Sequence, residues 1–132
     1  MSTFIDTSAL LAVLDADDLN HPAAKGAWAS LLADGDELHC TNYVLVETYA
    51  LLQNRLGMQA VRTFHEDIAP VLRVDWADAA SHASSVSALL TAGRRTLSLV
   101  DCASFEAMRR LGITVAFTFD RHFGEQGFRC MP

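Results

Sequence analysis

Short apolar runs alternate with amphipathic stretches along the whole chain, and this alternation predicts strands and helices in turn. Apolar, β-branched or aromatic runs predict strands at 3–5, 37–40, 70–74 and 114–118, with a short edge strand at 127–130. Apolar residues at helical spacing predict helices at 9–14, 22–33, 43–56, 59–68, 77–90 and 98–111. Strands that alternate with helices predict an α/β fold, a three-layer α/β/α sandwich with a mostly parallel central sheet.

The helix expected at 43–56 differs from the others because apolar residues surround nearly its whole circumference. A helix without a polar face belongs in a protein interior, so we expect this one to be deeply buried. Glu47 is the only charged residue in its first three turns. A carboxylate among apolar neighbours is costly unless it is paired or binds a cation.

Composition adds that the chain is a folded protein of one domain. With 132 residues, 51% of them hydrophobic, the chain is long enough for one core, and neither a linker nor a repeat divides it. We therefore expect a single domain spanning residues 1–132. The 16 acids outnumber the 10 lysines and arginines, which argues against a protein that coats DNA through its charge.

The cysteines and the N-terminus bear on where the protein works. Cys40, Cys102 and Cys130 are odd in number and show no metal-binding spacing, which is typical of buried thiols in a reducing compartment. Neither a signal peptide nor an apolar run long enough to span a membrane is recognisable. The sequence thus favours a cytoplasmic, soluble protein.

Four acids occupy positions that are unusual for solvated surface residues. Asp6 ends the first predicted strand, Asp120 follows a later one, Glu47 sits on the apolar helix, and Asp101 lies in the first turn of another helix. Because ligands bind beyond the carboxyl ends of parallel strands, these positions point to one edge of the sheet. A helix cap is the alternative for Asp6, Asp101 and Asp120, and an ion pair with a distant arginine is the alternative for Glu47.

Four segments carry a resemblance to a known family. They are Phe4-Ile5-Asp6-Thr7-Ser8-Ala9-Leu10, Asn42-Tyr43-Val44-Leu45-Val46-Glu47-Thr48, Leu97-Ser98-Leu99-Val100-Asp101-Cys102-Ala103-Ser104-Phe105 and Phe117-Thr118-Phe119-Asp120-Arg121-His122-Phe123. In order and spacing the chain resembles PIN-domain nucleases, the toxins of prokaryotic VapBC toxin–antitoxin pairs. The resemblance implies that Asp6, Glu47, Asp101 and Asp120 are the catalytic, metal-binding acids. It implies, more loosely, supporting roles for Thr7, Ser8, Asn42, Ser98 and Thr118.

The chemistry of these residues agrees with the resemblance. Carboxylate oxygens are hard ligands that suit Mg²⁺ or Mn²⁺, and such ions activate water and neutralise charge on a phosphate. The resemblance implies endonucleolytic cleavage of single-stranded or loop RNA, leaving a 5′-phosphate and a 3′-hydroxyl, together with a homodimer and a small antitoxin whose tail covers the acids. Arginines are candidates for RNA phosphate contacts, namely Arg94, Arg95, Arg109, Arg110 and Arg121.

Other functions fit the sequence less well. A haloacid dehalogenase-type phosphotransferase needs a second acid where this chain has Ser8, and it needs a catalytic lysine, whereas the only lysine is Lys25. A receiver domain lacks its late lysine for the same reason, and no nucleophile-elbow motif supports a hydrolase triad. The alternative left open is a PIN fold that binds RNA or an antitoxin without catalysis.

Overall fold

A five-stranded sheet forms the centre of the computed structural model, which covers residues 1–132. The strands run in the order β3-β2-β1-β4-β5, and every neighbouring pair is parallel. Their bounds are β1 (Ser2–Ile5), β2 (Glu37–Thr41), β3 (Leu72–Asp75), β4 (Val115–Phe117) and β5 (Arg129–Met131). The α/β prediction is confirmed, and the predicted C-terminal edge strand is present as β5.

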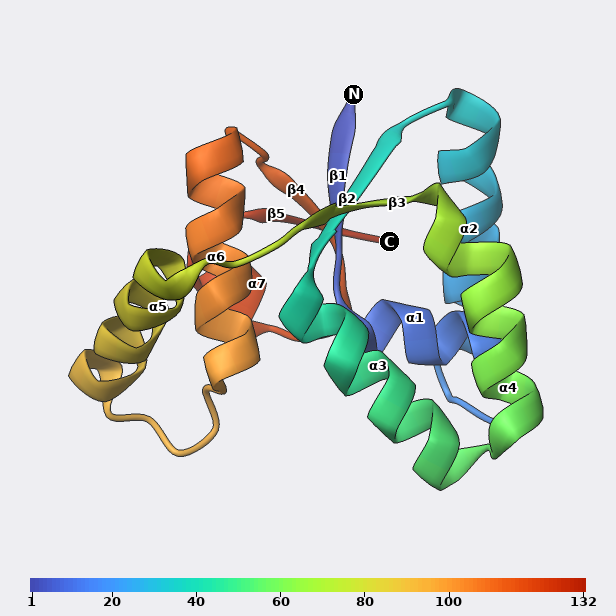
Figure 1. Cartoon of the computed structure of the whole chain (residues 1–132). Coiled ribbons are helices and arrows are strands. Elements are labelled where there is room, and N and C mark those ends of the chain that lie inside the picture. Colours follow the sequence, from blue (N-terminus) through green and yellow to red (C-terminus); the bar gives the residue numbers. More distant parts are fainter.

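Helices cover both faces of this sheet (Figure 1). In Figure 1, α1, α2 and α4 lie on one side of the strands, and α5, α6 and α7 lie on the other. The helices are α1 (Thr7–Leu14), α2 (His21–Asp34), α3 (Asn42–Arg55), α4 (Met58–Thr63), α5 (Ala79–Ala92), α6 (Leu99–Leu111) and α7 (His122–Glu125). Most lie within two residues of their predicted positions. The helix expected at 59–68 continues after α4 as a π-helical turn, Phe64–Ile68, and α7 was not predicted from the sequence.

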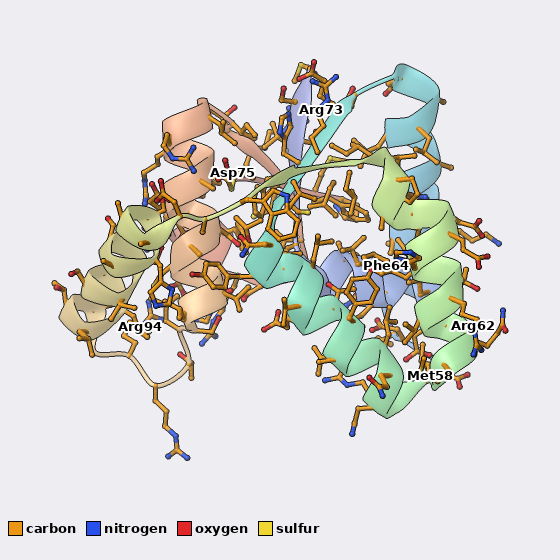
Figure 2. All side chains as sticks on the ribbon, viewed as in Figure 1. Met58, Arg62, Phe64, Arg73, Asp75 and Arg94 are labelled. Atoms are coloured by element: carbon orange, nitrogen blue, oxygen red, sulfur yellow. The ribbon has the colours of Figure 1, made fainter.

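Aromatic residues join the sheet to both helical layers. Phe4, at the centre of the sheet, lies 6.3 Å from Phe123, which in turn meets Phe105 of α6 edge to face at 4.9 Å between ring centres. On the other side Phe64 is fully buried and packs edge to face against Tyr49 of α3. Figure 2 shows Phe64 pointing inward, whereas Met58 and Arg62 of the same region extend away from the body of the protein.

The prediction that the helix at 43–56 is deeply buried was wrong. Only one stripe of α3 is buried, formed by Val44, Thr48 and Leu52, and Val46 on another face is 67% exposed. The physical reason is the position of the helix, because α3 packs against α1, α4 and α6 on one side and leaves the opposite side uncovered. The apolar surface of α3 therefore faces solvent in the single chain.

The expectation that all three cysteines are buried holds for two of them. Cys40 and Cys102 are buried, but Cys130 is exposed because it lies on the edge strand β5. None of the helices combines the length and the apolar character that crossing a membrane requires.

The chain enters its helices at one edge of the sheet. Asp6 joins β1 directly to α1, and Thr41, the last residue of β2, caps α3 by accepting a hydrogen bond from the Val44 amide. The segment after β4 reaches the same edge, since β4 lies beside β1 in parallel register. Three parts of the sequence thus meet where the parallel strands end, as expected for a ligand site in an open α/β sheet.

Candidate metal centre

All four predicted acids line one pocket at the carboxyl edge of the sheet. The pocket has a volume of about 510 Å³, and its walls come from α1, the α1–α2 loop, α3, the start of α6 and the segment after β4. The acids are Asp6, Glu47, Asp101 and Asp120. Residues far apart in sequence therefore present carboxylates to one open pocket.

Asp6 is the most buried of these acids and is held by two hydroxyl groups. Ser8 Oγ donates to Asp6 Oδ2 at 2.6 Å, and Thr118 Oγ1 donates to the same oxygen at 2.9 Å. Asp6 also caps α1, because its side chain accepts a hydrogen bond from the Ser8 amide. The other oxygen, Oδ1, receives no hydrogen bond from the protein, so it is free to bind a ligand in the pocket.

The same two hydroxyls position Asp120. Thr118 Oγ1 accepts a hydrogen bond from the Asp120 amide at 2.9 Å, and Ser8 Oγ accepts one from the Phe119 amide at 3.0 Å. The hydroxyls therefore tie the start of α1 to the segment after β4. As a result, the backbone that carries Asp120 is fixed relative to Asp6.

Asp101 stands at the start of α6, where helix capping fixes its orientation. Ser98 accepts a hydrogen bond from the Asp101 amide, and Asp101 Oδ2 accepts one from the Ser98 amide at 3.1 Å. The sequence left open whether Asp101 caps the helix or belongs to a site. In the structure Asp101 does both, because it forms the capping box and lines the pocket. One carboxylate oxygen holds the helix start while the other stays available.

Glu47 reaches the pocket from the second turn of α3. The Thr48 hydroxyl donates to Thr7 Oγ1 at 3.3 Å, which links α3 to the first turn of α1 and places Glu47 opposite the other acids. No cationic side chain lies within ion-pair distance of Glu47, so the alternative of a distant arginine partner is not realised.

The electrostatics of the pocket favour a bound cation. Burial raises the pKa of Asp6 from an ordinary 3.8 to about 6, opposed by the Ser8 and Thr118 hydrogen bonds and reinforced by the charges of Asp101 and Asp120. Burial also raises the pKa of Asp101, with a further contribution from Asp120. Neither Asp6 nor Asp101 has a cationic partner in the protein. Unpaired carboxylates with free oxygens are a donor set that fits Mg²⁺ or Mn²⁺.

The more loosely predicted residues separate into two groups. Ser8, Ser98 and Thr118 hydrogen bond to the acids, and Thr7 joins α1 to α3. Asn42 does not belong to the site: its side chain accepts a hydrogen bond from the Ala77 amide at 2.8 Å and connects α3 to the segment before α5.

None of the five arginines proposed for phosphate contacts lines the acidic pocket. Arg94 pairs with Glu125 at 2.9 Å, and Figure 2 shows it on the α5–α6 side of the molecule. Arg109 and Arg110 border a larger hollow of about 840 Å³ between α5 and α6. The cationic side chain that does line the acidic pocket is Arg55, two helical turns after Glu47 on α3, and it forms no ion pair.

The sequence interpretation also missed Asp18, Asn20 and His122. Asp18 was taken as a solvated loop acid, yet Asp18 and Asn20 line the pocket from the loop between α1 and α2. His122 is buried next to Asp120, with Nδ1 2.7 Å from Asp120 Oδ1. A signal for His122 was its place two residues after Asp120, whereas no local signal marks a loop residue that approaches the site only in the folded chain.

The fold and the pocket are those of an α/β protein that offers carboxylates to a cation at the carboxyl edge of a parallel sheet. The model of the PIN domain family matches residues 3–128, and the chain therefore belongs to the PIN-domain family.

Individual relatives agree with this assignment. The chain is 36% identical over 126 residues to the 23S rRNA-specific endonuclease VapC20 of Mycobacterium tuberculosis, covering 95% of this chain and 94% of the relative. The crystal structure of that bacterium's VapC20, described as a sarcin–ricin loop cleaving toxin, superposes with a TM-score of 0.84 at 34% identity over 96% of this chain and 95% of that one. FitAcB from Neisseria gonorrhoeae shares the fold, with a TM-score of 0.69 at 16% identity over 100% and 97% of the two chains.

Proposed function

We propose that this protein is a divalent-metal-dependent endoribonuclease and the toxin of a toxin–antitoxin pair, with residues 1–132 acting as a single nuclease domain in the cytoplasm. The observation that carries the proposal is the convergence of Asp6, Glu47, Asp101 and Asp120 on one pocket in which Asp6, Glu47 and Asp101 lack a cationic partner. Intact acids at all four positions favour catalysis over an RNA-binding or antitoxin-binding module without activity.

The chain's own residues would prepare this chemistry by holding carboxylates in place before RNA binds. Ser8 and Thr118 fix one oxygen of Asp6, and the capping box fixes one oxygen of Asp101. A bound Mg²⁺ or Mn²⁺ supplies an activated water and neutralises negative charge on the scissile phosphate. The pocket contains no serine–histidine or cysteine–histidine pair, so hydrolysis by water is the reaction that its residues support.

The substrate class follows from the relatives and from the charge of the site. VapC20 is named as specific for 23S rRNA, and this chain matches it over nearly its whole length. We therefore propose an exposed loop of ribosomal RNA as the substrate. Because Arg55 lines the pocket and forms no ion pair, it is a better candidate for holding an RNA phosphate than the ion-paired arginines.

Cleavage of ribosomal RNA in the presence of Mg²⁺ or Mn²⁺ is the direct test. Purified protein incubated with ribosomes is expected to produce a discrete fragment of the large ribosomal RNA with a 5′-phosphate end, which is mapped by primer extension. Excess EDTA should abolish the fragment, and added Mn²⁺ should restore it. Cleavage that continues unchanged in EDTA would show that the acids do not act through a metal.

The antitoxin is proposed on charge complementarity. The pocket presents five acids, Asp18 among them, against one arginine, so an inhibitory segment with a basic side chain would fit it. Such a segment would occupy the carboxylates and exclude RNA from them. A synthetic peptide with a central arginine, added to the cleavage assay, tests this partner: inhibition of cleavage that an otherwise identical peptide with glutamate does not cause would support it, and equal effects of the two peptides would contradict it.

A homodimer is proposed on the uncovered apolar surface of α5 and the first turns of α3. Except for His82, α5 carries no ionisable residue, and only Ser85 is fully buried in the single chain. Leu90 and Trp76 are 74% and 71% exposed, and a hydrogen bond between Tyr43 and His82 joins α3 to α5. Exposed large apolar side chains that lie close together mark a protein–protein contact, and a second copy of this chain is the partner proposed here.

Leu90→Glu is expected to convert the dimer to a monomer, because a charge would be buried against an apolar partner. Light scattering coupled to size-exclusion chromatography measures the mass directly. Met58→Glu is the matched control, since Met58 is exposed on α4, away from α5 (Figure 2). A parent protein that is monomeric at high concentration would exclude the dimer.

A further inference from the structure

His122 is a buried imidazole whose hydrogen bonding is incomplete. It begins α7, its exposure is 7%, and Nδ1 lies 2.7 Å from Asp120 Oδ1. At that distance an N–H aimed at the oxygen would form a strong hydrogen bond. The ring does not have this orientation, and Nδ1 is the one buried side-chain polar atom of the protein without a hydrogen-bond partner.

Negative charge surrounds the ring of His122, and the backbone N–H of His122 donates to Asp120 Oδ1 at 2.9 Å. One ring nitrogen of His122 and one carboxylate oxygen each of Asp101 and Asp120 lie within 4.8 Å of one another. The ring nitrogen Nε2 lies 3.5 Å from Thr96 Oγ1, and Thr96 itself lines the acidic pocket. A proton on Nε2 would face the Thr96 hydroxyl and would leave a lone pair on Nδ1.

A divalent cation bound by both Nδ1 and Asp120 Oδ1 would account for two polar atoms that lie 2.7 Å apart without a hydrogen bond between them. Two ligand atoms in adjacent positions of one octahedral cation lie ~3 Å apart, which is close to the separation observed here. Histidines that bind metals usually donate their second ring N–H to an oxygen acceptor, the role that Thr96 can fill. The incomplete hydrogen bonding of His122 is therefore explained by a cation shared with Asp120.

We propose that His122 Nδ1 is a nitrogen ligand of the divalent cation, together with Asp101 and Asp120. This assignment rests on the proposed function as a metal-dependent nuclease. It adds a nitrogen ligand to the carboxylate oxygens of the proposed metal site. Imidazole nitrogen suits transition metals, whereas Mg²⁺ prefers oxygen. The site should consequently bind Mn²⁺ more tightly than Mg²⁺, and His122 should be a cause of that preference.

Pulsed electron paramagnetic resonance of the full-length protein with one equivalent of Mn²⁺ tests the bond without any RNA. The expected result is a hyperfine coupling from a directly bound nitrogen, and that coupling should change from the ¹⁴N to the ¹⁵N pattern in protein labelled with ¹⁵N-histidine. Bound Mn²⁺ without a nitrogen coupling would overturn the assignment and leave an all-oxygen site. Failure of Mn²⁺ to bind would overturn this assignment together with the metal centre itself.

Substitution gives a second measurement. His122→Asn is expected to remove the nitrogen coupling and to weaken Mn²⁺ binding by ~10-fold or more, with a smaller loss for Mg²⁺. His65→Asn is the matched control, because His65 is exposed and bonds to Tyr49 away from the pocket. Equal losses for the two metals, or retention of the coupling in His122→Asn, would contradict the proposal. If His122→Asn does not fold, the labelled parent protein still decides it.

Discussion

Asp101→Asn is expected to lower the rate of RNA cleavage by ~100-fold or more, since displacement of a reacting group by about an ångström costs that much. The substitution removes a negative charge from the pocket, yet an asparagine oxygen can still accept the Ser98 amide hydrogen bond. The fold should therefore survive while activity is lost. Cells that express Asp101→Asn should grow normally, whereas cells that express the parent protein should stop growing.

Asp67→Asn is the matched control for this experiment. Asp67 is exposed in the π-helical turn after α4 and forms no ion pair, so the same chemical change lies outside the pocket. Its cleavage rate and toxicity should equal those of the parent at equal protein levels. An Asp101→Asn protein that is as toxic as the Asp67→Asn protein would exclude a catalytic role for Asp101.

Asp6→Asn is expected to stabilise the metal-free protein by ~3 kcal/mol at pH 7, the free energy that corresponds to the raised pKa of this carboxyl. The pKa rises from 3.8 to about 6 because the charged form is buried, so ionised Asp6 destabilises the fold at neutral pH. Asparagine removes this charge and caps a helix about as well as aspartate. Chemical denaturation in EDTA measures the gain.

The pH dependence has a defined sign. The folded protein binds the Asp6 proton more tightly than the unfolded chain. Ionised Asp6 therefore lowers the free energy of unfolding by its full amount above pH 6, and this loss disappears as pH falls toward 3.8. When the pH falls from 7 to 5, the free energy of unfolding of the metal-free parent should rise by ~1 kcal/mol because of Asp6. The Asp6→Asn protein should not show this part of the increase. Asp101, whose pKa is also raised, contributes to the pH dependence with the same sign.

Metal should reduce the difference in stability between the two proteins. At a hundred times its dissociation constant, Mn²⁺ is expected to stabilise the parent by ~2.7 kcal/mol and Asp6→Asn by much less, because a ligand is missing. Asp78→Asn is the control: Asp78 caps α5 through the Ser81 amide but is exposed. If Asp6→Asn is no more stable than the parent in EDTA, burial of the Asp6 charge does not destabilise the fold.

The sequence predicted that the four acids would meet at one edge of the sheet because they stand where local patterns are unusual. Asp6 and Asp120 follow apolar strands, and Glu47 is a lone charge on an apolar helix. These positions are readable because parallel strands end at one edge, so acids placed after different strands meet. The same logic predicted the parallel sheet and most of the helices.

What the sequence did not reveal depends on contacts between distant segments. Arg55 and Asp18 reach the pocket only because α3 and the α1–α2 loop fold over it, and His122 is notable only through its unmet hydrogen bond. The burial of α3 was overestimated because apolar character alone does not distinguish an internal helix from one with an uncovered face, such as that of Val46.

The hydroxyl pair that holds Asp6 has a consequence for how the protein is made. Thr118 Oγ1 and Asp6 Oδ2, 2.9 Å apart in the fold, are separated by 112 positions in the chain. Ribosomes add residues in order, so a growing chain carries Asp6 long before it has Thr118 or Asp120. A nascent chain that ends before β4 therefore lacks both the complete pocket and the Thr118 hydroxyl that holds Asp6. The proposed metal centre can therefore form only after nearly the whole chain has been synthesised.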